Sequence, residues 1–163
     1  MARVLIVGCG CRGRELATAL VAEGHAVRGT TRRREGLEAI EASGAQAALA
    51  NPDRLSTVLP RLEGVSVVCW LMGTAVGEPE LIAGIHGPRL ETLLERLVDT
   101  PVRGLLYEAA GSVQADSLKH GAALVREAGR RWQIPTEILT VDPADHEAWL
   151  AAMTLAVVRL LTP

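Results

Sequence analysis

The chain has few aromatic side chains and almost no lysine. Its 163 residues include no Phe, one Tyr and three Trp, and Lys119 is the only lysine among 17 basic residues. Proteins that bind single-stranded nucleic acid stack the bases on aromatic side chains, so this shortage argues against that function. The 19 acidic residues bring the net charge to −2, which leaves no broad basic surface for nucleic acid in general. We therefore expect no nucleic-acid partner.

Cysteine and long apolar runs are also scarce. Three Cys, two of them at Cys9 and Cys11, do not make a disulfide framework, and a reducing compartment fits them better. The further Cys or His ligands of a zinc site are missing around this pair, so we predict no metal. No apolar run reaches the roughly 20 residues that span a bilayer, and Val4–Val7 is too short for a signal peptide. These absences predict a soluble cytoplasmic protein without membrane contact.

The sequence does contain a regular alternation of short apolar runs with amphipathic segments. The runs predict strands at Arg3–Val7, His25–Thr31, Gln46–Leu49, Val65–Leu71, Val102–Tyr107 and Ile134–Val141. The amphipathic segments predict helices at Arg14–Glu23, Glu35–Ala42, Arg54–Leu62, Arg89–Val98, Asp116–Trp132 and Ala144–Leu161. Such alternation is typical of a three-layer, doubly wound α/β fold with a parallel sheet. We predict one Rossmann-like domain over residues 1–163, with six strands in the order 3-2-1-4-5-6.

Two connections are expected to be irregular. Asn51-Pro52-Asp53 has the composition of a turn and of a helix cap. The stretch Gly73–Gly87 is rich in Gly and Pro, which predicts mainly a loop with one helical turn. His86 lies inside this stretch and is interpreted as an ordinary loop residue.

A glycine motif joins the first strand to the first helix. The segment Gly8-Cys9-Gly10-Cys11-Arg12-Gly13 has the pattern G-x-G-x-x-G in the position where a dinucleotide-binding loop occurs. The first glycine would permit the tight turn, the second would leave room for a pyrophosphate, and the third would allow close helix–strand packing. Free N–H groups and the dipole at the helix start would attract the phosphates. We predict dinucleotide binding here; the alternative is a glycine-rich turn that binds nothing.

The end of the second strand indicates which dinucleotide is bound. An NAD site has an acidic residue there, whereas this chain has Thr31-Arg32-Arg33. An arginine can bind a 2′-phosphate through paired N–H donors, and Thr31 adds a hydroxyl. We therefore predict NADP(H) rather than NAD(H), with a solvated basic helix start as the alternative. After the fourth strand, Leu71, Met72 and Gly73, and with them the segment up to Ala75, are further candidate cofactor contacts.

Three stretches resemble a known superfamily. VLIVGCGCRGRELATAL, VRGTTRR and VSVVCWLMG are similar to the NAD(P)-binding proteins of the atypical and extended short-chain dehydrogenases/reductases, and VRGLLYEAAGSV resembles their fifth-strand region. The resemblance extends to about Val113. It implies a Rossmann fold and an NADP-type cofactor, with Gly8, Gly10 and Gly13 in the glycine loop. Arg32 or Arg33 would match the superfamily's basic residues for the 2′-phosphate.

The chain departs from this superfamily in the catalytic motif. Active members carry a Ser near the fifth strand and a Tyr-x-x-x-Lys, but here Ala109 and Ala110 stand at the serine positions and Ala115 precedes Lys119 by four residues. The extended members are also longer, and their C-terminal segment forms the substrate pocket. The catalytic residues are therefore left unassigned.

Residues that could still transfer a proton follow the fifth strand, where ligands of parallel sheets bind: Tyr107, Glu108, Ser112, Lys119 and His120. The interpretation that we favour is a core aromatic at the strand end, followed by a solvated helix face.

Two functions follow from these patterns. One is an NADP(H)-dependent oxidoreductase acting on a small carbonyl or alcohol. The alternative is a non-catalytic NADP(H)-sensing or regulatory module, which the missing catalytic set favours. An epimerase is less favoured, because sugar-nucleotide sites need the absent C-terminal region. The last helix is apolar around most of its surface, so we also predict a homodimer through it.

Overall fold

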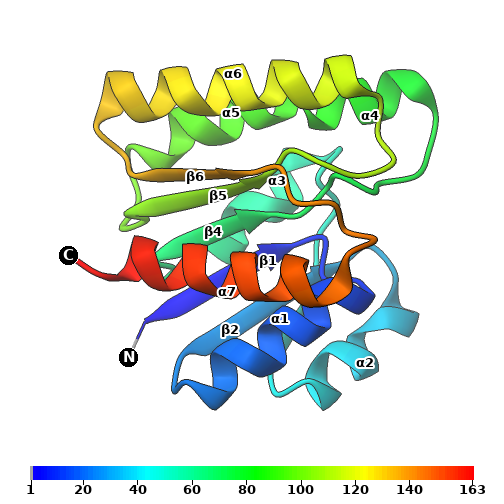
Figure 1. The fold of residues 1–163 in the computed structure, drawn as a ribbon, viewed down its shortest axis with the longest axis vertical. Coiled ribbons are helices and arrows are strands. Elements are labelled where there is room, and N and C mark those ends of the chain that lie inside the picture. The colour runs from blue at the N-terminus through cyan, green and yellow to red at the C-terminus, as the bar shows by residue number, and fades with distance from the viewer. Residues whose placement is uncertain (1) are drawn as a thin grey trace.

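The computed structural model describes residues 2–163, and its centre is a single six-stranded parallel sheet (Figure 1). The strands are β1 (Arg3–Val7), β2 (Ala26–Thr31), β3 (Gln46–Leu49), β4 (Val67–Trp70), β5 (Gly104–Glu108) and β6 (Thr136–Leu139). They lie in the order β3-β2-β1-β4-β5-β6, and each neighbouring pair is parallel. The predicted fold class and strand order are confirmed.

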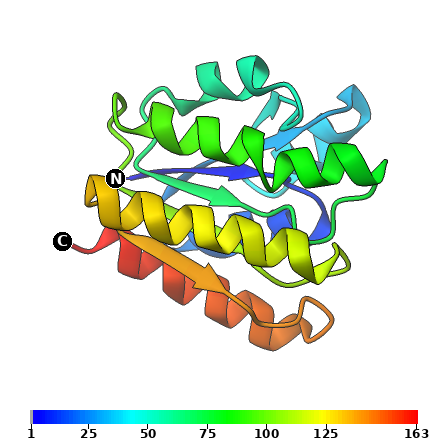
Figure 2. The same ribbon diagram turned by 90° about the horizontal axis from the view of Figure 1, so that it is seen from above.

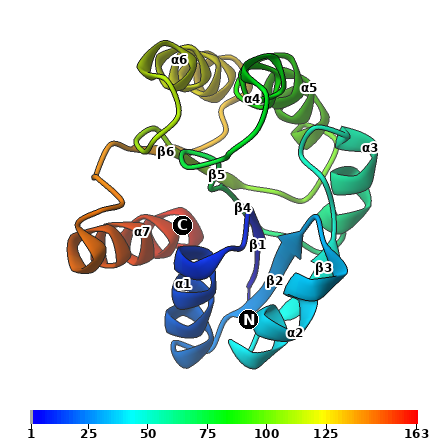
Figure 3. The ribbon, with the colours of Figure 1, turned by 90° about the vertical axis from the view of Figure 1, so that its right-hand side faces the viewer.

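Helices cover both faces of this sheet. They are α1 (Cys11–Ala22), α2 (Leu37–Ala42), α3 (Leu55–Val58), α4 (Pro79–Ile85), α5 (Pro88–Leu97), α6 (Ala115–Trp132) and α7 (His146–Leu161), with 3-10 turns at η1 (Arg34–Gly36) and η2 (Leu59–Leu62). Figure 2 shows α5 and α6 side by side over one face, and Figure 3 shows α1 and α7 side by side on the other. Every residue of β4 and β5 is buried, because these central strands are covered on both faces.

Two apolar cores separate the layers. One lies between the sheet and α3 to α6, and α5 contributes Leu90, Leu93, Leu94 and Leu97 to it at helical spacing. The other lies under α1, α2 and α7, where Trp149 and Met153 are almost completely buried. Among the described residues, no helix combines the length and apolar character needed to cross a bilayer.

Three predicted elements are corrected by the structure. Helix α1 begins at Cys11 rather than Arg14, because Gly10 already caps it and the second half of the glycine motif is helical. The stretch predicted as loop contains α4, seven residues long, which is stabilised by burial of Ile82 and Ile85 rather than by its composition. The predicted helix Arg54–Leu62 is divided into α3 and η2, since Pro60 has no N–H for a helical hydrogen bond.

The turn after β3 is present, but its role as a helix cap is wrong. The Asn51 side chain accepts a hydrogen bond from the Asp53 N–H at 3.0 Å, which closes a local turn. The cap position of α3 is occupied by Arg54, whose side chain makes no capping bond.

Candidate functional site

The glycine loop after β1 has the geometry that its sequence predicts. Gly8 has φ of 86°, and a Cβ atom on it would lie 2.5 Å from the carbonyl oxygen of Leu71. A Cβ on Gly13 would lie 3.2 Å from the Gly8 carbonyl, so this glycine allows α1 to pack closely against β1. A Cβ on Gly10 would meet no atom within 4 Å. Gly8 and Gly13 are therefore required by the fold, whereas Gly10 borders open space.

The start of α1 faces this open space. Gly10 is the N-cap and offers no side chain, and the first turn of the helix contains no acidic residue. The first N–H groups of a helix have no partner within it, and its dipole is positive at this end. The loop therefore presents a surface suited to an anion such as a phosphate.

A hollow of about 270 Å³ lies beside the loop, at the carboxyl ends of β1, β2 and β4. Its lining residues are Gly8, Cys9, Gly10, Arg14, Thr30, Thr31, Arg32, Gly36, Ala50, Pro52, Leu71, Met72, Thr74 and Ala75. Within residues 2–163, two arginines and no carboxylate belong to this lining. The hollow is therefore positively charged overall.

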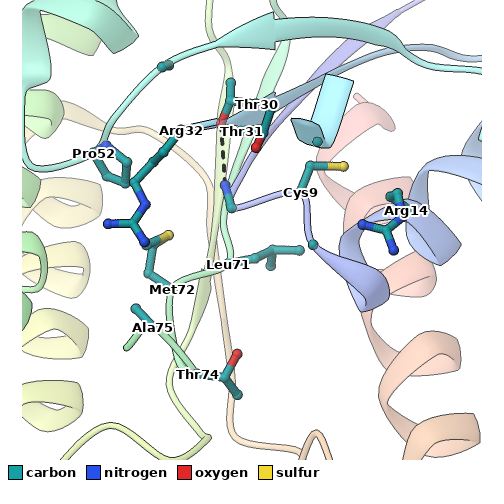
Figure 4. A pocket seen from close by; sticks show the side chains of 14 residues that line it. Cys9, Arg14, Thr30, Thr31, Arg32, Pro52, Leu71, Met72, Thr74 and Ala75 are labelled. Atoms are coloured by element: carbon teal, nitrogen blue, oxygen red, sulfur yellow. Dashed lines mark hydrogen bonds between the residues drawn. The ribbon is translucent and has the colours of Figure 1, made fainter. Parts of the chain in front are cut away.

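The two arginines lie on opposite sides of the hollow (Figure 4). Arg32 follows β2, lies beside Pro52 and extends towards Met72, while Arg14 projects from α1. The Thr30 hydroxyl accepts a hydrogen bond from the Gly8 N–H at 3.4 Å and so connects β2 to the loop. The Thr31 hydroxyl both donates to the carbonyl of Arg33 and accepts from its N–H, each at 3.3 Å, so it shapes the turn that carries Arg32.

A smaller hollow of about 60 Å³ adjoins the same loop and shares Gly8, Gly10, Leu71 and Thr74 with the larger one. It is lined by Gly8, Gly10, Cys11, Arg12, Gly13, Leu71, Thr74, Glu108 and Trp149. The Arg12 Nε donates to the carbonyl oxygen of Pro143 at 3.2 Å, which joins the loop to the segment before α7.

Glu108 is a buried acid on the wall of the smaller hollow. Only 3% of the residue is exposed, and its carboxylate accepts hydrogen bonds from the Gly73 N–H at 2.9 Å and from the Trp149 Nε1–H at 2.8 Å. Burial raises the pKa of Glu108, and these two hydrogen bonds and the nearby charge of Arg12 oppose the rise only in part.

The predicted cofactor residues fall into three groups. Those on the larger hollow are Gly8, Cys9, Gly10, Thr31, Arg32, Leu71 and Met72, and those on the smaller hollow include Cys11, Arg12 and Gly13. Arg33 and Gly73 line neither. Arg33 is exposed before η1, and the Gly73 N–H is used by Glu108. Cys9 offers only its backbone, because its side chain is buried against Gly29 and burial raises the pKa of its thiol to about 11.

Sequence reasoning missed several lining residues. Arg14 directly follows the last glycine of the motif, and Ala50 and Pro52 follow β3, whose carboxyl end meets the same edge of the sheet. These residues could have been predicted from their positions in the sequence, directly after the glycine motif or shortly after a strand.

The interpretation of His86 as an ordinary loop residue is wrong. His86 is fully buried at the end of α4, where its Nδ1 lies 2.6 Å from the Tyr107 hydroxyl and its Nε2 lies 2.8 Å from the Met72 carbonyl oxygen. A carbonyl can only accept, so Nε2 carries the proton and Nδ1 accepts from Tyr107. Burial lowers the pKa of His86 and raises that of Tyr107. The structure therefore makes Tyr107 part of a core contact.

The other residues considered for proton transfer are scattered. Lys119 and His120 are exposed on α6, and within residues 2–163 no hydrogen bond connects either of them to Tyr107 or Glu108. Ser112 lines a separate hollow of about 260 Å³. The residues after β5 thus form no single catalytic group.

No family model matches the chain, and no curated protein is significantly similar to it in sequence. Solved structures share its fold. A UDP-glucose 4-epimerase from Thermotoga maritima, solved with UDP-glucose, has 14% identity and a TM-score of 0.70 over 85% of this chain and 54% of its own. A UDP-glucuronic acid 4-epimerase from Bacillus cereus, in complex with NAD, has 17% identity and a TM-score of 0.67 over 85% and 55%. A short-chain dehydrogenase from Streptomyces avermitilis has 20% identity and a TM-score of 0.62 over 86% and 65%.

These similarities establish the fold. The chain has the same Rossmann-like fold as these solved structures, which agrees with the fold that the resemblance of its sequence implied. It spans about half the length of the two epimerases.

Proposed function

We propose that this chain binds a nicotinamide dinucleotide at the glycine loop and prefers NADP(H) to NAD(H). The observation that carries the proposal is the hollow beside the loop, which has Arg32 and Arg14 in its lining and no carboxylate. An acid at the end of β2 would repel a 2′-phosphate, whereas an arginine binds it through paired donors.

The residues present fit such a ligand. Gly10 leaves open space at the start of α1, where the helix N–H groups bind the pyrophosphate. Arg32 would bind the 2′-phosphate, and Met72 and Ala75, which line the same hollow, would contact the adenosine half. When bound, the nicotinamide supplies or accepts a hydride. The chain's own residues bind and orient the dinucleotide.

Calorimetric titration with NADP(H) and NAD(H) tests this proposal. We expect saturable binding that is tighter for NADP(H). Arg32→Ala should weaken NADP(H) binding by about 10- to 100-fold, because it removes hydrogen bonds to a charged group. It should leave NAD(H) binding nearly unchanged. Arg34→Ala is the matched control, since it removes the same charge from an exposed position outside the hollow. Equal losses in the two variants, or no binding of either nucleotide, would contradict the proposal.

We propose further that the bound nucleotide is sensed rather than turned over. Support comes from the residues that would move a proton: Lys119 is exposed, Ala115 stands four residues before it, and the Tyr107 hydroxyl is committed to His86. A chain that binds the cofactor without the Tyr-x-x-x-Lys pair would act as a regulatory module.

The second candidate is an oxidoreductase acting on a small carbonyl or alcohol. One observation favours it, namely the hollow of about 260 Å³ that shares Ala75 with the dinucleotide hollow. Its lining includes Ser112, Gln114 and Ser117 and no charged side chain, which suits a neutral polar molecule. Consumption of NADPH with a panel of small carbonyls distinguishes the two. We expect binding without turnover, and substrate-dependent oxidation would favour the enzyme.

We also propose that two copies associate through α7. Leu155 on this helix is half exposed, and it lines an apolar hollow with Leu150 and Val158 between α7 and α1. A second copy would cover this surface.

A further inference from the structure

The smaller hollow combines two features that oppose each other. Its loop residues, Gly10 to Gly13, form the start of α1, which suits a phosphate. The same lining contains Glu108, which is almost completely buried. A phosphate and a carboxylate repel each other, and the repulsion is strong where little water separates them. Bringing both charges into this space is therefore unfavourable unless one of them is neutralised.

The surroundings of Glu108 neutralise it only in part. The Gly73 N–H and the Trp149 Nε1–H are neutral donors. Arg12 lines the same hollow, and its positive charge opposes the rise in the pKa of Glu108, but within residues 2–163 no hydrogen bond joins the two side chains and the Arg12 Nε donates to the carbonyl of Pro143. From α1, Cys11 is the other titratable group in the lining. The neighbouring Tyr107 lies in the opposite core and is bonded to His86 there.

We propose that Glu108 takes up one proton when the dinucleotide binds and faces it as the neutral carboxylic acid. This inference rests on the proposed function and deepens it, because it makes the affinity of that site depend on pH. In the step, one carboxylate oxygen of Glu108 gains H⁺ from solvent. The charge of the protein rises by one, and no bond in the dinucleotide forms or breaks.

Two physical reasons support this step. Protonation removes the repulsion between the carboxylate and the entering pyrophosphate, and the burial of Glu108 already disfavours its charged form. The carboxylic acid also gains an O–H donor, so an acceptor that would have been repelled can accept a hydrogen bond. The carbonyl and hydroxyl oxygens can still accept from Gly73 and Trp149.

Binding experiments at several pH values test the inference. NADP⁺ is titrated into the whole chain between about pH 7 and pH 9, a range in which its 2′-phosphate is ionised throughout. Once the pH exceeds the pKa of Glu108 in the free protein, the Kd should rise by about tenfold for each pH unit. Titrations in two buffers of different ionisation enthalpy should show uptake of about one proton on binding in this range.

Three variants separate Glu108 from other titratable groups. Glu108→Gln should bind NADP⁺ with a Kd that is nearly independent of pH and with no proton uptake. Glu15→Gln removes a carboxylate of α1 that lies outside the hollow, in a pair with His146, and should keep the steep dependence. Thiols titrate in the same range of pH, so Cys11→Ser is also tested and should keep the steep dependence.

The outcomes that overturn the inference are distinct from those that overturn the proposed function. A Kd of the unaltered chain that does not change with pH, without proton uptake, overturns only the role of Glu108. The same conclusion follows if Glu108→Gln keeps the steep dependence, or if Cys11→Ser loses it. Absence of NADP⁺ binding at every pH overturns both. If Glu108→Gln fails to fold, proton uptake by the unaltered chain still decides the question.

Discussion

At the scale of single residues, Gly8 is needed for the fold of the loop, whereas Gly10 is needed only for the proposed binding. Gly8 has a left-handed backbone and lies close to the Leu71 carbonyl, so an alanine there strains the chain. Gly10 has ordinary dihedral angles for an N-cap and free space around it. The same G-x-G-x-x-G pattern thus contains one glycine that the turn requires and one that only an incoming ligand would require.

Alanine at these two positions should affect different properties, namely stability at Gly8 and nucleotide affinity at Gly10. Gly8→Ala should lower the free energy of unfolding by about 1 to 3 kcal/mol from backbone strain alone. Gly10→Ala should change it by less than about 0.5 kcal/mol, yet weaken NADP(H) binding by about tenfold or more, because the methyl group occupies the space for the pyrophosphate. Urea unfolding and calorimetric titration of both variants provide the measurements. Unchanged affinity in Gly10→Ala would be evidence against a phosphate at this loop.

The residues that surround the loop show how far the sequence could predict the site. The glycine motif and Arg32 were recognisable because their spacing along the chain is local. Glu108 and Trp149 are 41 residues apart, and their hydrogen bond depends on β5 and α7 packing together. No periodicity in either segment reveals such a contact, so the carboxylate in the smaller hollow becomes apparent only in the folded chain.

At the scale of elements, α4 is anchored by the buried contact between His86 and Tyr107. His86 ends α4, Tyr107 belongs to β5, and the carbonyl of Met72 follows β4. Three elements therefore meet at one imidazole. Only one helical turn was predicted in this stretch and not the seven residues of α4, because its Gly- and Pro-rich surroundings resemble a loop and its stability comes from tertiary contacts. By contrast, α5 and α6 were predicted from their apolar periodicity alone.

The buried imidazole should make stability depend on pH. Burial lowers the pKa of His86 below its ordinary value of 6.5. As the pH falls below 6.5, the unfolded chain takes up a proton that the folded chain does not, so stability decreases with falling pH. Glutamine does not titrate, so His86→Gln removes this part of the pH dependence of stability. The free energy of unfolding should be higher for the unaltered chain at pH near 7.5, because the variant lacks the buried imidazole contact, and the gap should narrow towards pH 5.5 by at most about 1.4 kcal/mol for each pH unit.

Urea unfolding of both proteins at the two pH values measures this gap. The raised pKa of Glu108 acts in the opposite direction, since its contribution to stability is lost as the pH rises. Both proteins contain Glu108, so its effect cancels in the difference. A gap that stays constant would show that His86 does not titrate differently in the folded and unfolded states.

The hydroxyl in the same contact gives a second test at this scale. Tyr107→Phe leaves the Nδ1 of His86 buried without its donor, while the ring still fills its place in the core. We expect a loss of about 1 to 3 kcal/mol in the free energy of unfolding. Ser112→Ala is the control, because this hydroxyl is exposed after β5 and should cost almost nothing. Equal effects of the two substitutions would argue against the hydrogen bond.

At the scale of the whole molecule, the sheet and its two layers were predictable because the alternation of strands and helices leaves few arrangements. After β3 the chain crosses from one face of the sheet to the other and continues at β4 beside β1. The carboxyl ends of β1, β2 and β4 therefore surround one hollow. The alternation of strands and helices does not indicate whether two copies of the chain associate. Helix α7 buries Trp149, Met153 and Val157 against its own sheet, and its apolar remainder lies at the surface beside α1.

The proposed homodimer can be tested through this remaining surface. Leu155 is 50% exposed on α7, and Val98 is 49% exposed at the end of α5 on the opposite layer. An aspartate at either position replaces an exposed apolar side chain, so both variants should fold. Light scattering at micromolar concentration should give the mass of two copies for the unaltered chain and for Val98→Asp, but of one copy for Leu155→Asp, because a charge buried without a partner opposes association. A single-copy mass for the unaltered chain would exclude the dimer, and dissociation caused by Val98→Asp would place the interface on the other layer.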